Sequence, residues 1–140
     1  MAHQFRKHYT VNQARTLLPQ IRAWLAELGQ VRKRLLQYDQ RLGELVAAGI
    51  DAGGDTVNHW VKALCRIKTL LLEFHKREIQ IKDLDRGLID FPSLIAGKEA
   101  FLCWEQDEDD IEFWHDLESG YAGRDFVRSS GRHSRRPQTE

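Results

Sequence analysis

The sequence predicts a mainly α fold, in which a long antiparallel helical hairpin precedes a small antiparallel β meander. Apolar residues recur at steps of three and four from Val11 to Phe74, with one glycine-rich interruption, and beyond Glu78 apolar and polar residues alternate. The chain has 140 residues, of which 41% are hydrophobic, so it can bury one ordinary core. We therefore expect a single domain over residues 1–128, with the hairpin at 10–78 and the β region at 79–127.

The first helix is expected to begin beside Thr10, because Thr10 and Gln13 have the spacing of a capping box. Its apolar pattern continues as far as Leu45. The segment GIDAGGD, residues 49–55, contains three glycines and two aspartates and is typical of a loop. The second helix should run from about residue 56 to 78, and its expected apolar face consists of Val57, Trp60, Val61, Leu64, Ile67, Leu71 and Phe74.

The apolar stripe of the first helix is wider than one partner helix covers, because Leu17, Trp24 and Leu36 extend it sideways. Surfaces of this kind are commonly buried against another subunit. We expect a homodimer in which two hairpins form a four-helix bundle. The alternative is that the sheet and the second helix cover the stripe within one chain.

Three or four short antiparallel strands are expected after the hairpin, within residues 79–83, 87–91, 98–105 and 110–116, because the apolar periodicity changes to two after Glu78. The LDRG segment between the first two forms a tight turn in which Gly87 accepts a positive φ. The last two strands are predicted to form a hairpin with one mainly apolar face. Its expected cross-strand pairs are Trp104 with Ile111, Leu102 with Phe113 and Ala100 with His115.

Charge and composition narrow the functional classes to which the protein can belong. The 21 basic residues balance the 21 acidic ones, which argues against binding to nucleic acid. No apolar run is long enough to span a membrane and no signal peptide is visible, so a cytoplasmic protein is expected. The two cysteines form no CxxC motif and are expected to be reduced thiols. The Arg-rich tail, residues 129–140, has no apolar residue and is expected to be disordered.

Several segments together resemble the bacterial family of the domain of unknown function 2203. In chain order they are YTVNQARTLLPQIR, KDLDRGLIDFP, FLCW, IEFWHD and GYAGR, within about residues 8–127. The resemblance implies a long helical hairpin followed by a small compact region, in bacterial cytoplasm, and no established activity. The characteristic polar residues of the family map to Asp83, Asp85, Asp90, Cys103, Glu108, His115 and Arg124. The chain departs from the family at Glu78 and Asp107, where glycine is usual.

A metal site is one interpretation of the polar residues in the β region. Asp83 and Asp90 lie in adjacent predicted strands around one turn, and His115 can add a nitrogen ligand to their carboxylates. Such a mixed oxygen and nitrogen set suits a divalent transition metal such as Mn, Fe or Zn. The alternative is that both aspartates form turns or pair with arginines, and that His115 is a core histidine satisfied by one partner.

A second group of candidates for ligand binding contains Cys103, Trp104, Glu108 and Arg124. Arg124 follows two glycines in GYAGR, where free backbone N–H groups and a guanidinium can hold an anion. A salt bridge from Arg124 to the acidic hairpin is the simpler interpretation. Cys103 in a strand is better explained as a small buried hydrophobe than as a nucleophile.

These observations favour a non-catalytic, homo-oligomeric module that binds a protein or a small ligand. The alternative is a metal-binding protein or a metal-dependent enzyme, with Asp83, Asp90 and His115 as ligands. No phosphate-binding glycine loop, nucleophile elbow or HExxH motif is present in the sequence. The sequence therefore leaves open whether the protein is an enzyme.

Overall fold

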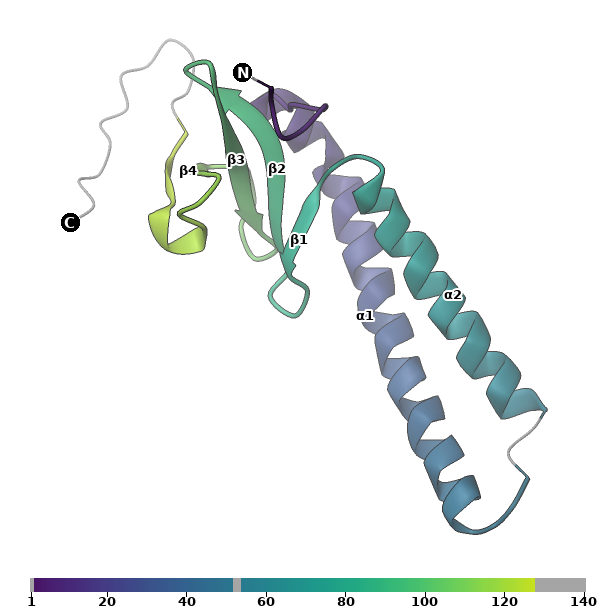
Figure 1. The fold of residues 1–140 in the computed structure, drawn as a ribbon. Coiled ribbons are helices and arrows are strands. Elements are labelled where there is room, and N and C mark those ends of the chain that lie inside the picture. The colour runs from purple at the N-terminus through teal and green to yellow at the C-terminus, as the bar shows by residue number, and fades with distance from the viewer. Residues whose placement is uncertain (1, 52–53, 128–140) are drawn as a thin grey trace. The chain divides into compact units, whose positions relative to one another are not determined.

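The computed structural model describes residues 2–51 and 54–127. Within these residues lie the helices α1 (Val11–Ala47) and α2 (Asp55–His75) and one antiparallel sheet in the order β1-β2-β3-β4-β5 (Figure 1). The strands and one short 3-10 helix are β1 (Gln80–Asp83), β2 (Leu88–Ile95), β3 (Lys98–Glu105), β4 (Phe113–Asp116), η1 (Tyr121–Gly123) and β5 (Asp125–Phe126).

The prediction of a mainly α protein is wrong. Besides the two helices the chain forms a five-stranded sheet, so its fold is α+β. β2 continues through Pro92, where the sequence suggested that the strand ends, and β5 has only two residues, too few to show an alternation. Pro92 is tolerated because its carbonyl accepts the N–H of Tyr9 on the side that faces away from β3. The N–H that proline lacks would lie on that same open edge.

The chain divides into two compact units, one made of the residues up to Gln20 and from Phe74 onward, the other of Ile21–Glu73. The predicted single domain over residues 1–128 stays a prediction, and the tail at 129–140 lies outside the described residues.

The unit Ile21–Glu73 holds most of α1 and all but the end of α2. Arg66 donates two hydrogen bonds to the carboxylate of Glu27, and the Trp60 indole donates to Asp39, so the two helices run antiparallel. The buried side chains of this unit are Ile21, Leu25, Leu28, Val31, Ala63 and Leu70. The predicted face of α2 is only partly correct, because Val61, Leu64 and Leu71 are exposed.

In the other unit, α1 begins as the sequence predicts. The Thr10 hydroxyl accepts the N–H of Gln13 at 3.1 Å, and the Gln13 amide oxygen accepts the N–H of Thr10 at 2.9 Å. This reciprocal pair is a capping box. No helix within the described residues is both long and apolar enough to cross a bilayer.

The β3–β4 register differs from the predicted one by one residue. Cys103 lies opposite Phe113 and Phe101 lies opposite His115. Because side chains alternate between the two faces of a sheet, this shift moves His115 away from the apolar face formed by Ala100, Leu102 and Trp104. His115 therefore shares a face with Phe101 and Cys103.

Candidate functional site

Three neighbouring strands bring Asp90, Cys103 and His115 together on one face of the sheet. Asp90 of β2 pairs directly with Cys103 of β3, and His115 of β4 lies two pairs further along, opposite Phe101. One ligand atom of each residue lies within 4.8 Å of the others. All three residues are buried, with exposed fractions of 1%, 0% and 2% respectively. The strand register thus forms a polar cluster with one oxygen, one sulfur and one nitrogen donor.

The hydrogen bonds of His115 define which ring nitrogen carries a proton. Nδ1 lies 2.6 Å from the carbonyl oxygen of Asp116, which can only accept, so Nδ1 must donate. Nε2 lies 3.0 Å from Oδ2 of Asp90. A neutral ring would turn its Nε2 lone pair toward the carboxylate, so a positive charge must lie between the two atoms. A proton meets this requirement, and so does a metal ion.

The pKa of His115 indicates what the metal-free site holds. Burial by itself lowers the pKa of His115, but the hydrogen bonds with Asp90 and with the Asp116 carbonyl outweigh burial and raise the pKa above its ordinary value. The imidazole of His115 therefore takes up a proton more readily than a free histidine does, next to the carboxyl group of Asp90. Both side chains are 2% exposed, so this contact is shielded from water.

Cys103 is a protonated thiol in this environment. Burial raises the pKa of Cys103 far above its usual range, the Asp90 carboxylate raises it further, and the Arg124 guanidinium lowers it only in part. A thiolate is therefore strongly disfavoured without a metal. Since Nε2 of His115 faces Asp90 and Nδ1 faces a carbonyl, neither ring nitrogen is free to activate the thiol. The arrangement does not support a nucleophilic cysteine.

One oxygen of Asp90 lacks the partner that a buried carboxylate needs. Oδ1 has no hydrogen-bond partner within the described residues, although Oδ2 is bonded to His115. A buried, unsatisfied carboxylate oxygen carries a large desolvation cost. The cluster therefore presents a carboxylate oxygen with no strong hydrogen-bond partner, beside the Cys103 thiol, whose own weak hydrogen bond with Asp90 helps to raise the pKa of Cys103.

Asp83, the third predicted metal ligand, lies elsewhere. It pairs with Leu88 next to a break in the β1–β2 register, and its Oδ1 accepts the N–H of Arg86 at 3.1 Å. Asp83 is not part of the cluster around Asp90, and its carboxylate closes the turn before Gly87. This turn has the predicted positive φ at Gly87, with a value of 63°.

The predicted ligand-binding residues Cys103, Trp104, Glu108 and Arg124 form one connected group. Arg124 Nη2 lies 2.6 Å from both carboxylate oxygens of Glu108 and 3.5 Å from the Cys103 carbonyl. The Trp104 indole donates to the Glu108 carbonyl at 2.9 Å. The carboxylate of Glu108 thus occupies the guanidinium that an anion would need, so these contacts hold the β3–β4 connection in place.

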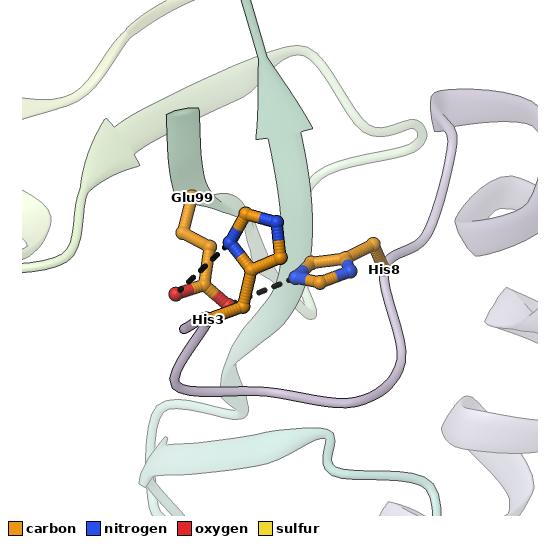
Figure 2. Close-up of side chains that lie close together, drawn as sticks. All are labelled: His3, His8 and Glu99. Atoms are coloured by element: carbon orange, nitrogen blue, oxygen red, sulfur yellow. Dashed lines mark hydrogen bonds and ion pairs between the residues drawn. The ribbon is translucent and has the colours of Figure 1, made fainter. Parts of the chain in front are cut away.

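A further cluster, made of His3, His8 and Glu99, has no signature in the sequence, because its members are scattered along the chain. His8 Nε2 lies 2.9 Å from Glu99 Oε2, and His3 Nδ1 lies 3.9 Å from Glu99 Oε1 (Figure 2). Glu99 belongs to β3, whereas both histidines belong to the N-terminal arm, defined here as residues 2–9. Only the folded arm brings them together.

The arm is held by a second carboxylate, that of Glu78. Glu78 Oε1 accepts the N–H groups of Arg6 and Lys7 at 2.8 and 2.7 Å. Glu78 has φ +59°, in the left-handed region that glycine adopts most easily. The expected glycine at this position was the only sequence signal of this backbone geometry.

Comparisons with known proteins identify the family but not a function. No curated protein and no solved structure matches the chain. A family model described as "Uncharacterized conserved protein (DUF2203)" matches residues 7–127. The chain therefore belongs to the DUF2203 family.

Proposed function

We propose that the protein is a non-catalytic metal-binding module that holds one divalent transition metal between Asp90, Cys103 and His115. The carrying observation is the 3.0 Å contact of His115 Nε2 with Asp90 Oδ2 beside an unsatisfied Asp90 Oδ1. The metal takes the place of the proton that the imidazole and the carboxylate otherwise share. Cys103 replaces Asp83 of the predicted ligand set.

The donor atoms form a closed set for a small metal ion. Asp90 can supply both oxygens, Cys103 its sulfur and His115 its Nε2, which makes four donors in a distorted tetrahedron. Two ligands at about 2.0–2.1 Å from a tetrahedral metal lie roughly 3.3 Å apart. The observed 3.0 Å between Oδ2 and Nε2 therefore needs only a small opening. Mixed nitrogen, oxygen and sulfur ligands favour Zn²⁺ or Fe²⁺ over Ca²⁺ and Mg²⁺.

The second bond of His115 supports the same proposal. Metal-ligating histidines usually donate their other ring N–H to a carbonyl or a carboxylate, which fixes the tautomer and the ring orientation. The 2.6 Å bond from Nδ1 to the Asp116 carbonyl has this form. Its presence without a metal means that the ring is already oriented for ligation.

A closed, buried set supports a structural or storage role rather than catalysis. Catalytic metal sites keep a position open for water or substrate, whereas structural sites are fully ligated by the protein. Asp90, Cys103 and His115 are at most 2% exposed, so solvent reaches none of them directly. We therefore infer that the metal stabilises the β2–β3–β4 sheet.

The test is a titration of chelator-treated protein with Co²⁺, a spectroscopic substitute for Zn²⁺. Wild type should develop a near-ultraviolet thiolate-to-cobalt band as Co²⁺ is added, and Cys103→Ser should lose this band. Cys65→Ser is the matched control, because Cys65 is the exposed thiol of the chain and should leave the band intact. A band that disappears only in Cys65→Ser overturns the proposal.

Protonation provides a second readout that needs no variant. Binding must displace one proton from the Cys103 thiol and one from His115 Nε2, so affinity should rise with pH. X-ray absorption at the zinc edge of wild-type protein should show one sulfur among nitrogen and oxygen neighbours. A purely nitrogen and oxygen shell would exclude this site even if the Cys103→Ser variant failed to fold.

We also propose that the module is a homodimer. Large apolar side chains on α1 and α2 are exposed in the unit Ile21–Glu73, and a second copy of this unit would bury them. These side chains are Leu36, Val61, Leu64, Leu71 and Leu72. Sedimentation should show that Leu64→Glu with Leu71→Glu gives a monomer, whereas Leu94→Glu on β2, also exposed, leaves a dimer. A monomeric wild-type protein would exclude the dimer.

A further inference from the structure

We infer that His3, His8 and Glu99 form a second, solvent-accessible site for a divalent transition metal, distinct from the buried cluster. Their ligand atoms lie within 4.8 Å of one another. Figure 2 shows both imidazole rings beside the carboxylate of Glu99, one ion pair to each carboxylate oxygen. Two imidazoles and one carboxylate are a set that suits Zn, Fe, Ni or Cu and leaves coordination positions open.

Glu99 is prepared for this role by the backbone of the arm. The N–H of Gln4 donates to Oε1 at 2.6 Å and the N–H of Phe5 donates to Oε2 at 2.9 Å. A carboxylate has about four lone-pair directions, so each oxygen keeps one for a histidine or a metal. Ligating carboxylates are typically held by hydrogen bonds of this kind. Both amides therefore orient the carboxylate without using up its donor capacity.

The charge state of Glu99 fits the same role. Burial by itself would raise the pKa of Glu99, but the hydrogen bonds with His8 and the amides of Gln4 and Phe5 outweigh it and lower the pKa to about 2. The carboxylate is thus ionised at any ordinary pH.

This site is accessible to solvent, whereas the cluster of Asp90, Cys103 and His115 is buried. The His3 side chain is 49% exposed and that of His8 is 17% exposed. His8 also lines an open depression of about 470 Å³ beside the start of α1. The residues around this depression are Lys7, His8, Tyr9, Gln13, Thr16 and Leu17. Water or an external ligand can therefore occupy the open coordination positions.

A metal at this site would tie the arm to β3. The arm also places the Phe5 ring 5.4 Å from Phe101, whose ring lies 5.5 Å from His115. Metal binding at His3 and His8 is therefore expected to order the aromatic cover of the buried site. A metal at the surface site would thus reduce the motion of the arm.

The experiment uses Zn²⁺ and the full chain carrying Cys103→Ser, which removes the buried thiolate ligand. This protein should bind one Zn²⁺ per chain and shift the ring resonances of His3 and His8 in long-range ¹H–¹⁵N spectra. His3→Gln and His8→Gln should each weaken binding at least about tenfold, equivalent to roughly 1.4 kcal/mol. The matched control is His59→Gln, a change at an exposed histidine of α2, which should leave affinity unchanged.

The result separates this site from the buried one. If Cys103→Ser protein binds Zn²⁺ through the two arm histidines, the surface site stands whether or not wild type shows a thiolate band. If Cys103→Ser and Cys103→Ser/His8→Gln bind Zn²⁺ equally, the surface site is refuted. The backbone amide spectrum of each variant shows whether the sheet is folded, so a folded variant without a change in affinity counts against the proposal.

Discussion

The guanidinium of Arg124 lies against both oxygens of the Glu108 carboxylate, with Nη2 2.6 Å from each. The side chains are only 9% and 19% exposed. The same guanidinium lies 3.9 Å from the centre of the Phe113 ring and 4.5 Å from that of Tyr121. Arg124 thus joins the β3–β4 connection to the segment that leads into β5.

Arg124→Gln should therefore destabilise the fold by about 3–5 kcal/mol, because it leaves Glu108 as a poorly compensated, mostly buried charge. The matched change is Arg15→Gln, which breaks an ion pair with Asp110 whose side chains are 46% and 41% exposed. Exposed pairs are worth less than about 1 kcal/mol. Urea unfolding of both variants measures the difference, and equal losses would contradict the buried character of the Arg124 pair.

Gly87 should be sensitive to substitution and Gly97 much less so. Both have positive φ, 63° and 80°, so alanine costs about 1–2 kcal/mol of backbone strain at either position. A Cβ at Gly87 would also lie 2.6–2.8 Å from the Gln106 side chain, whereas nothing lies within 4 Å at Gly97. Gly87→Ala should therefore unfold at lower urea than Gly97→Ala. Equal midpoints would mean that Gln106 moves aside without cost.

Glu78→Gly should separate global stability from the order of the arm. Glycine relieves roughly 1 kcal/mol of strain at φ +59° but removes the acceptor for the Arg6 and Lys7 amides. Hydrogen exchange at those two amides should accelerate while the sheet amides stay protected. Glu78→Asn is the control, since asparagine tolerates the left-handed region but its shorter side chain also loses the arm. Unchanged exchange in both variants would show that Glu78 does not hold the arm.

Tyr9 should make the fold sensitive to alkaline pH. Burial raises the pKa of Tyr9 above its ordinary value of 10.0, and its hydroxyl donates to the Arg77 carbonyl at 2.7 Å. A phenol whose pKa is raised by folding contributes stability that is complete below the unfolded value and falls as pH rises through the folded value. Wild type should therefore lose stability above about pH 10 more steeply than Tyr9→Phe.

The control for Tyr9 is Tyr121→Phe, since Tyr121 is 41% exposed. Urea midpoints across the alkaline range provide the measurement. If Tyr9→Phe and wild type lose stability in parallel, the Tyr9 hydroxyl does not cause the alkaline loss.

The helices and the turn at Gly87 could be predicted because their sequence signals are local. The Thr10 and Gln13 capping box, the helical spacing of apolar residues and the Gly87 turn depend on residues close together in the chain. Strand pairing depends on distant residues, and an error of one residue in the β3–β4 register placed His115 on the wrong face. In the observed register Cys103 lies on the same face of the sheet as His115 and belongs to the cluster around Asp90. The predicted register assigned Cys103 to the opposite face.

The contacts of the arm could not be predicted from the sequence, for a different reason. Glu99 lies more than ninety residues from Gln4, Phe5 and His8. The arm has no periodicity, and its order depends on backbone amides donated to two distant carboxylates. Every residue except proline has a backbone N–H group, so no particular residue type in the arm predicts such contacts.

The bond from Tyr9 to Pro92 also bears on how the protein avoids aggregation. β2 has eight residues but β1 has only four, so the far half of β2 is not covered by β1. An uncovered strand edge is a template for strands of other chains. Pro92 has no N–H to offer there, its carbonyl is taken by Tyr9, and the Ser93 hydroxyl donates to the Tyr9 carbonyl. The arm thus covers this open edge, and a chain that lost the arm would be prone to pair edge to edge with the strands of other chains.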